Sequence, residues 1–277
     1  MNTRKLETLQ AIFRDLDQVL VAYSGGVDST LVAKVAFDVL GDKALAVTAA
    51  SASLMAEDLE DAVIQASNIG IRHEIIETDE LANPNYASNP TNRCYFCKSE
   101  LHGALVPLAA ERGIATVVDG ANLDDLGDYR PGFQAAREKG IRSPLVEAQL
   151  SKLEVRALSR FLGLSTWDKP AMPCLSSRFP YGESISQEKL LRLAAAERYL
   201  RKLGLRHFRV RSTTDTARIE VPPDSIQDFM MQTDLPALVS AFQSYGYTFV
   251  SLDLEGYRSG KLNTVLSPEQ RQAFTHT

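Results

Sequence analysis

The sequence predicts an α/β fold in which helices cover both faces of a parallel sheet, followed by a smaller α+β domain. Two observations lead to this class. Short apolar runs alternate with segments of helical periodicity up to about residue 165, and such alternation is typical of parallel strands joined by helical crossovers. A segment rich in proline and serine then interrupts this alternation, and two later strands are separated by a short turn.

The elements of the first part follow from the spacing of apolar residues. Helical segments place them three and four positions apart, and three segments stop at Gly41, Gly70 and Gly113, where glycine commonly follows a helix. The strands are the short apolar runs between these segments. In order, we predict a helix at 3–16, a strand at 19–22, a helix at 29–40, a strand at 44–50, a helix at 56–68, a strand at 73–78, a helix at 99–112 and a strand at 115–120.

The second part begins with a predicted connector at 166–186, which carries Cys174 and separates a first domain at 1–165 from a second at 187–277. Helices are expected at 187–203 and 223–245, and strands at 207–211, 217–221 and 248–254. Alternation along the first two strands predicts that the polar faces bearing Arg209, Arg211 and Glu220 lie side by side.

Glu197 is a carboxylate within a mainly apolar helical stripe. Because an unpaired buried carboxylate is costly, Glu197 should meet Arg209, Arg211 or a metal ion. The alternative to a functional role is that Glu197 forms an ordinary structural ion pair.

Composition excludes several classes of protein. The formal net charge is -5 and no block of lysine and arginine is present, so a broad nucleic-acid footprint is not expected. No apolar stretch reaches the roughly 18 residues of a membrane span, and the first residues lack the apolar core of a signal peptide. We therefore expect a cytoplasmic protein with a small-molecule partner. An odd number of cysteines in that compartment argues against a disulfide framework.

The stretch Ser24 to Ser29, SGGVDS, joins the first strand to the next helix. A glycine-rich turn that opens a helix offers backbone N–H groups and a positive dipole end to an anion. The common phosphate loop, G-x-x-x-x-G-K-[ST], is absent because no lysine follows these glycines. Ligands of parallel sheets bind beyond the carboxyl ends of strands, which is where this turn lies. The alternative is an ordinary turn capped by serine.

The same stretch resembles the pyrophosphate loop of the ATP pyrophosphatases, a family with a Rossmann-like sheet of the adenine-nucleotide α-hydrolase kind. The resemblance implies cleavage of ATP between its α and β phosphates. Asp28 would place Mg²⁺, and it would act with the residues that hold phosphate oxygens, namely Ser24, Gly25, Gly26, Ser29 and Thr30.

Three cysteines add a second kind of chemistry. Cys94 and Cys97 form a C-x-x-C pair, and Cys174 lies in the connector. From the residues alone, the alternatives are a redox dithiol, a structural zinc site with His102 as the fourth ligand, a [4Fe–4S] cluster on three cysteines, and thiols without a shared role. A cluster held by three thiolates leaves one iron open to an outside ligand such as hydrosulfide.

Four further stretches narrow the resemblance, namely DYRPG at 128–132, CLSSRFPYG at 174–182, RVR at 209–211 and ARIEVP at 217–222. With them, the chain resembles the LarE family of ATP-dependent sulfur transferases. This resemblance implies adenylation of a carboxylate of pyridinium-3,5-biscarboxylate mononucleotide, followed by sulfur delivery to give a thiocarboxylate. Two rounds give the bis-thiocarboxylate used in the nickel-pincer nucleotide cofactor of lactate racemase. Relatives form symmetric oligomers, so a homo-oligomer is expected.

The cysteines place the chain in one branch of that family. In single-cysteine relatives, the cysteine matching Cys174 gives up its own sulfur and becomes dehydroalanine. This chain departs from that pattern because it also has Cys94 and Cys97. It resembles the three-cysteine branch, for which a [4Fe–4S] cluster that passes on sulfide is implied. The alternatives are sacrifice of Cys174, a tRNA-thiolating enzyme, and a nucleotide-sensing or metal-storage module that releases no pyrophosphate.

The resemblance also assigns roles to charged residues. Lys98 would contact phosphate or AMP, and Asp128 and Arg130 would organise the mouth of the nucleotide site. The substrate or product phosphate would be held by Ser177, Arg178, Arg209 and Arg211, and an acidic metal-binding group would be formed by Glu197, Glu220 and Asp228.

Overall fold

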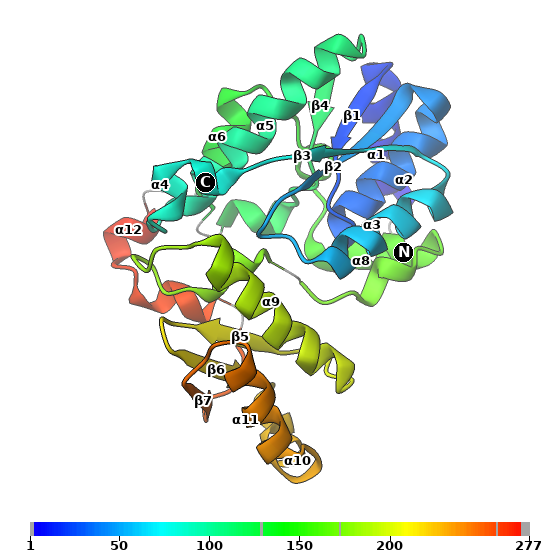
Figure 1. Cartoon of the computed structure of the whole chain (residues 1–277). Coiled ribbons are helices and arrows are strands. Elements are labelled where there is room, and N and C mark those ends of the chain that lie inside the picture. Colours follow the sequence, from blue (N-terminus) through cyan, green and yellow to red (C-terminus); the bar gives the residue numbers. More distant parts are fainter. Residues whose placement is uncertain (1–2, 128–129, 172, 259, 273–277) are drawn as a thin grey trace. The chain divides into compact units, whose positions relative to one another are not determined.

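The computed structural model describes residues 3–127, 130–171, 173–258 and 260–272. Its contacts group the chain into two compact units (Figure 1). The first unit holds the described residues of 1–80, 92–172 and 268–277, and the second holds those of 81–91 and 173–267. This grouping differs from the sequence-based domains because the segment 81–91 belongs to the second unit and residues 268–272 belong to the first.

The first unit is built on a parallel sheet. Its strands are β1 (Val19–Ala22), β2 (Ala44–Ala50), β3 (Arg72–Glu77) and β4 (Thr116–Val118). They lie in the order β3-β2-β1-β4, with β1 paired in parallel to both β2 and β4. The chain therefore moves outward from β1 through β2 to β3 and then returns to the other side of β1. Such a reversal of strand order marks the ligand-binding edge of open α/β sheets.

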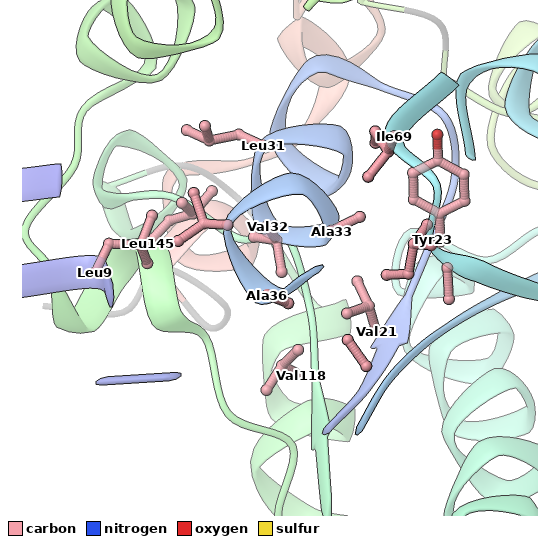
Figure 2. Packing of buried hydrophobic residues seen from close by; sticks show 14 of the residues in the cluster. Leu9, Val21, Tyr23, Leu31, Val32, Ala33, Ala36, Ile69, Val118 and Leu145 are labelled. Carbon is pink, nitrogen blue, oxygen red and sulfur yellow. The ribbon is translucent and has the colours of Figure 1, made fainter. Parts of the chain in front are cut away.

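Helices cover both faces of this sheet, as the sequence predicted. One apolar cluster joins Val19 and Val21 to residues of α1 (Thr3–Leu16), α2 (Val27–Leu40), α3 (Ala56–Ile69) and α8 (Lys152–Phe161). Figure 2 shows part of this cluster, including Val21 of β1 and Val32 of α2. A second cluster joins Leu20 to α5 (Arg93–Glu111) and α6 (Gly132–Glu138). Successive residues of β1 thus face opposite helical layers.

Two helix starts differ from the prediction. Helix α2 begins at Val27 rather than residue 29, and α5 begins at Arg93 rather than residue 99. Cys94 and Cys97 therefore lie within α5, whereas we had expected them to precede it. The first turns of α5 carry cysteine, aromatic and charged side chains instead of a buried apolar stripe. Periodicity could not reveal them for this reason.

Shorter elements complete the first unit. Helix α8 opens with a capping box, because Ser151 Oγ and the Glu154 carboxylate satisfy each other's backbone N–H groups. Further helices of the first unit are α7 (Pro144–Glu147) and α12 (Pro268–Gln272).

Both units also contain short 3-10 turns. They lie at Gly41–Lys43, Glu80–Ala82, Leu123–Gly127, Ser165–Asp168, Leu175–Arg178, Pro223–Ser225 and Lys261–Val265.

The second unit is the predicted α+β module. Helix α9 (Gln187–Lys202) precedes a sheet in which β6 (Thr216–Glu220) lies between β5 (Arg209–Ser212) and β7 (Phe249–Leu252). Strands β5 and β6 are antiparallel, and β6 and β7 are parallel. The small mixed sheet agrees with the sequence prediction.

The single helix predicted at 223–245 was wrong. The structure has α10 (Ile226–Gln232) and α11 (Leu235–Ser244), separated at Thr233 and Asp234. The Asp234 side chain accepts a hydrogen bond from the Ala237 N–H at 3.0 Å and so caps a new helix, with a proline in its first turn.

The segment 81–91 holds the chain around Cys174 in place. It contains α4 (Pro84–Ala87), and the Tyr86 hydroxyl lies 2.6 Å from Ser176 Oγ. Asn89 Nδ2 donates to the Pro180 carbonyl at 2.7 Å, and the Asn89 carbonyl accepts from the Gly182 N–H at 2.8 Å. These polar contacts fix much of the connector within the second unit.

Among the described residues, no helix combines the length and the apolar character needed to cross a membrane.

Replacing Leu145 with alanine should lower the free energy of unfolding by about 2–5 kcal/mol, because a fully buried leucine leaves a cavity. Leu153→Ala is the matched control, since this leucine is 80% exposed and should change stability by less than about 0.5 kcal/mol. Urea unfolding measures both values. Similar losses in the two variants would contradict the assignment of the core.

Candidate phosphate-binding and thiol site

The turn after β1 has a backbone that only glycine accommodates well. Gly25 has a φ of +65°, and a Cβ built on it would lie 2.8 Å from the Cα of Ala62 in α3. Gly26 is the N-cap residue of α2, with extended backbone angles. The turn therefore presses against α3 and passes directly into the first turn of α2.

Two hydroxyls tighten this turn. Ser29 Oγ accepts a hydrogen bond from the Ser24 N–H at 3.2 Å and lies 3.1 Å from Ser24 Oγ. Ser29 and Thr30 are buried at the start of α2. The first N–H groups of a helix have no partner within the helix, and they favour a bound anion. The arrangement can therefore hold a phosphate with backbone and hydroxyl donors.

The chain after β4 reaches the same place. A Cβ built on Gly120 would lie 2.8 Å from the backbone nitrogen of Ser29 and 3.0 Å from its Cα. Gly120 thus allows the β4 end to pack directly on the first turn of α2. Residues following β1 and β4 meet at the edge where the strand order reverses.

Asp28 lies in the first turn of α2 and makes two polar contacts from distant segments. Its carboxylate forms an ion pair with Lys152 Nζ at the start of α8 and accepts a hydrogen bond from Asn122 Nδ2 at 3.2 Å. A carboxylate beside this turn is the kind of oxygen ligand that Mg²⁺ prefers. The lysine ammonium balances the carboxylate charge in this arrangement.

A buried carboxylate and a lysine lie near the end of β4. Asp119 Oδ1 accepts hydrogen bonds from Ser143 Oγ at 2.7 Å and from the Ala121 N–H at 3.1 Å. Burial raises the pKa of Asp119, while the Ser143 hydrogen bond and the charge of Lys98 oppose this shift. Lys98 therefore places positive charge near Asp119, on the β4 side of the candidate phosphate site.

The three cysteines are divided between the units. Cys94 and Cys97 are three residues apart in α5, so their side chains lie about 60° apart around the helix and share a face. Cys94 is exposed and Cys97 half-buried. Cys174 is half-buried in the second unit, at the start of a 3-10 turn. Within the described chain, no three or more His, Cys, Asp or Glu side chains are grouped in a way that could hold a metal ion.

His102 does not join the thiols. It is fully buried in α5, five residues after Cys97, which places it about 140° around the helix axis. Burial lowers the pKa of His102 to about 3, and the nearby charge of Lys98 adds to this shift. The helix geometry therefore gives no support to the alternative of a zinc site completed by His102.

In the second unit, Glu197 has a different partner from the one expected. Arg178 Nε lies 2.7 Å from Glu197 Oε1, and Arg178 Nη2 lies 2.9 Å from Oε2. Glu197 thus forms the expected structural ion pair with an arginine, but the partner is Arg178 and not Arg209 or Arg211. Sequence periodicity located the buried carboxylate, but it could not show that Arg178 from the connector would reach it.

The other charged residues of this unit are placed as follows. Arg211 Nη2 lies 2.9 Å from Glu220 Oε2, which confirms that the polar faces of β5 and β6 lie side by side. Arg209 donates to the Phe208 carbonyl at 2.6 Å and lies over the Tyr257 ring. Burial, with the charge of Arg178, lowers the pKa of Arg209 to about 10. Asp228 is exposed on α10.

The predicted phosphate and metal roles of these residues stay predictions. Within the turn that carries Cys174, Arg178 Nη1 donates to Ser177 Oγ at 3.0 Å, and Arg211 Nη1 donates to the Ser177 carbonyl at 3.0 Å. Of the residues assigned to the mouth of the nucleotide site, Arg130 forms an ion pair with Asp125 at 2.7 Å. Asp128 lies outside the described residues.

Sequence analysis missed three residues around the turn. Besides Asn122 and Lys152, Lys169 donates from Nζ to the Gly25 carbonyl at 3.1 Å and forms an ion pair with Asp61 of α3. Each comes from a segment far from Ser24 in the chain. A local pattern could not identify them, and α8, which begins at Lys152, was not among the predicted helices.

The amino-acid sequence is similar to one protein family over its first third and to several known proteins over most of its length. The NAD synthase family matches residues 9–92. The pyridinium-3,5-bisthiocarboxylic acid mononucleotide synthase of Lactiplantibacillus plantarum is 42% identical over 271 residues, covering 98% of both chains. An uncharacterised protein of Synechocystis sp. is 63% identical over 95% of this chain and 98% of its own length. An uncharacterised protein of Methanocaldococcus jannaschii is 28% identical over 87% of this chain and 91% of its own.

Gly25→Ala should destabilise the protein more than Gly113→Ala. Both glycines have positive φ, so alanine carries a backbone cost of about 1–2 kcal/mol at either position. At Gly113 nothing lies within 4 Å of the new methyl, whereas at Gly25 the methyl overlaps Ala62 and should cost about 1–3 kcal/mol more. Denaturant unfolding compares them. Equal losses would contradict the packing of the turn on α3.

His102 should make the protein less stable in acid. In the unfolded chain its pKa is about 6.5, so below this pH the unfolded state takes up a proton that the folded state excludes. At pH 5 the loss of unfolding free energy due to His102 should be about 2 kcal/mol relative to pH 7.5. His102→Gln removes this contribution. Identical pH dependence in wild type and variant would contradict a neutral, buried imidazole.

Proposed function

Because the chain belongs to the LarE family of ATP-using sulfur transferases, we propose that it adenylates a carboxylate of pyridinium-3,5-biscarboxylate mononucleotide and replaces the AMP with sulfur. Two rounds would give the bis-thiocarboxylate used for the nickel-pincer nucleotide cofactor. The observation that carries this proposal is the turn from Ser24 to Ser29, whose donors converge at the switch point of the parallel sheet. The 42% identity to a bisthiocarboxylate mononucleotide synthase over nearly the whole chain supports the choice of substrate.

The adenylation step uses the first unit. A carboxylate oxygen of the substrate attacks the α phosphorus of ATP, the bond from that phosphorus to the bridging oxygen breaks, and pyrophosphate leaves. Ser24, Ser29 and the first N–H groups of α2 would hold the departing phosphates, and Asp28 would hold Mg²⁺ against them. Lys98 would offset negative charge on the β4 side of the site. The product is an acyl adenylate, which a sulfur nucleophile can attack.

The sulfur step uses the thiols. A sulfur nucleophile bonds to the acyl carbon, and AMP leaves with the former carboxylate oxygen. Cys94 and Cys97, on one face of α5, fit two ligands of a [4Fe–4S] cluster that Cys174 would complete. When bound, such a cluster supplies an iron able to carry hydrosulfide. The three thiolates would then serve as ligands and keep their own sulfur.

The alternative is that Cys174 gives up its sulfur. Its thiolate would attack the acyl carbon and expel AMP to give a thioester. Removal of the Cα proton of Cys174 would then break the Cβ–Sγ bond, which leaves a thiocarboxylate and dehydroalanine.

We further propose that the protein works as a cytoplasmic homo-oligomer on this small nucleotide, with no nucleic-acid partner.

Asp28→Asn and Cys174→Ser should separate the two steps. Asp28→Asn should lower pyrophosphate release about 10²-fold or more, because it removes charge that places the metal. Cys174→Ser should still release pyrophosphate but form no thiocarboxylate. Protein purified without oxygen is assayed for iron and acid-labile sulfide, then incubated with ATP and the pyridinium nucleotide while pyrophosphate and masses are followed.

Protein mass decides between the sulfur sources. Thiolated nucleotide formed without loss of protein sulfur supports the cluster route, and protein lighter by one H₂S identifies Cys174 as the donor. Lys34→Gln is a control for altered surface charge, because within the described chain Lys34 forms its ion pair with Asp38, one turn along α2. Thiolation of tRNA in preference to the pyridinium nucleotide would refute the proposed substrate.

A further inference from the structure

The carbonyl of Cys174 is held by three donors. It accepts hydrogen bonds from the Ser177 N–H at 3.0 Å, from Ser177 Oγ at 2.8 Å and from Arg178 Nη1 at 3.1 Å. The same Arg178 nitrogen donates to the Pro173 carbonyl at 2.6 Å and to Ser177 Oγ at 3.0 Å. One guanidinium group therefore fixes the backbone immediately before and at the cysteine.

Arg178 is itself held from the opposite side. Its side chain and that of Glu197 are each 2% exposed, and they form a two-point ion pair across the second unit. Glu197 Oε1 also accepts from the Val210 N–H of β5 at 3.3 Å. Removing one partner of such a buried pair strongly destabilises the folded protein, because the other charge would remain buried without compensation. The position of the Arg178 guanidinium is thus set by α9 and β5.

A second buried pair holds the end of the same turn. Arg211 Nη1 donates to the Ser177 carbonyl at 3.0 Å, and Arg211 Nη2 pairs with the fully buried Glu220 at 2.9 Å. The turn from Cys174 to Ser177 is therefore attached at both ends to arginines that two glutamates orient. The Tyr86 hydroxyl, 2.6 Å from Ser176 Oγ, adds a third attachment.

We infer that Arg178 and Arg211, each oriented by its buried glutamate, are positioning residues that fix the backbone of Cys174 for the sulfur step. This inference rests on the proposed function, in which Cys174 carries or supplies sulfur. It differs from the roles that resemblance assigned. Most N–H groups of Arg178 already have protein acceptors, so binding a phosphate would require it to release the turn.

The same contacts bear on the expected acidic metal group. A metal ion at Glu197 would have to displace the Arg178 guanidinium from both carboxylate oxygens. At Glu220 it would have to displace Arg211, while Asp228 lies exposed on α10. Two arginines therefore occupy positions at which a metal ion would bind these carboxylates, although the Glu220 oxygens pair with Arg211 by charge and make no hydrogen bond within the described chain. The glutamates then act on Cys174 only through the arginines.

The two half-reactions should respond differently when the turn around Cys174 is loosened. Adenylation requires the phosphate turn but no cysteine, whereas sulfur transfer requires a correctly placed thiol. A displacement of about 1 Å in a reacting group can cost about 10²-fold in rate. Loosening the turn should therefore slow thiocarboxylate formation and leave pyrophosphate release intact. Loss of a substrate-phosphate ligand would instead raise the KM for the nucleotide in both half-reactions.

The experiment compares Arg178→Lys with Arg192→Lys. Lysine keeps the positive charge but cannot bind Glu197 at two points while reaching the loop carbonyls. Arg192 is the matched control, because it also donates to main-chain carbonyls of the second unit, at Thr213, Thr214 and Gly246. Pyrophosphate release and thiocarboxylate formation are measured with the pyridinium nucleotide. The iodoacetamide labelling rates of Cys174 and Cys94 are measured in the same molecule by peptide mass spectrometry.

For Arg178→Lys we expect at least a tenfold fall in kcat for thiocarboxylate formation, with KM and pyrophosphate release within twofold of wild type. The ratio of Cys174 to Cys94 labelling should change at least fivefold, and Arg192→Lys should change neither quantity. A tenfold rise in the nucleotide KM with slowed pyrophosphate release would overturn the inference in favour of a phosphate ligand. An unchanged labelling ratio would also overturn it.

A second variant and a substrate-free measurement cover the cases in which Arg178→Lys does not fold or the wild-type protein is inactive. If Arg178→Lys does not fold, Ser177→Ala removes one donor to the Cys174 carbonyl and should cause a smaller change in the same direction. If the wild-type protein forms no thiocarboxylate, the proposed function fails. The labelling ratio then still tests whether Arg178 fixes Cys174, since it needs no substrate.

Discussion

The geometry of the candidate site depends on one close contact, between the turn after β1 and helix α3. Gly25 can lie against Ala62 only because it lacks a side chain and tolerates a left-handed backbone. This contact brings the turn directly into α2, so that the helix N-terminus and two serine hydroxyls face the edge where the strand order reverses. The geometry of this candidate phosphate-binding turn thus follows from sheet topology and from the size of one residue.

A second structural constraint operates in the other unit. There, charged side chains are buried in matched pairs, and their remaining hydrogen-bonding capacity is directed at the backbone around Cys174. Burying charges costs free energy that apolar residues would not incur, so buried pairs are poor evidence for stability. Under the proposed function, holding the backbone of Cys174 in place would give a functional reason for these pairs. The two units therefore contribute different parts of the proposed chemistry.

The sequence predicted most of the fold, because apolar periodicity and glycine stops mark strands and helices locally. It failed where local patterns conflict or are silent. The start of α5 lacks an apolar stripe, so Cys94 and Cys97 were not placed on a helix. The break before α11 depends on a cap at Asp234 that a long helical pattern concealed. Partners such as Lys152 for Asp28 and Arg178 for Glu197 arise from tertiary packing, which spacing alone does not encode.

The proposed chemistry begins when a carboxylate is activated on the α phosphate of ATP, with the ATP held by the turn after β1. The most direct test uses pyridinium nucleotide labelled with ¹⁸O in its carboxylates, with the products analysed by mass spectrometry. Attack of the carboxylate on the α phosphorus predicts one ¹⁸O atom in AMP for each thiocarboxylate formed. Release of ADP, or of AMP without the label, would rule out this mechanism.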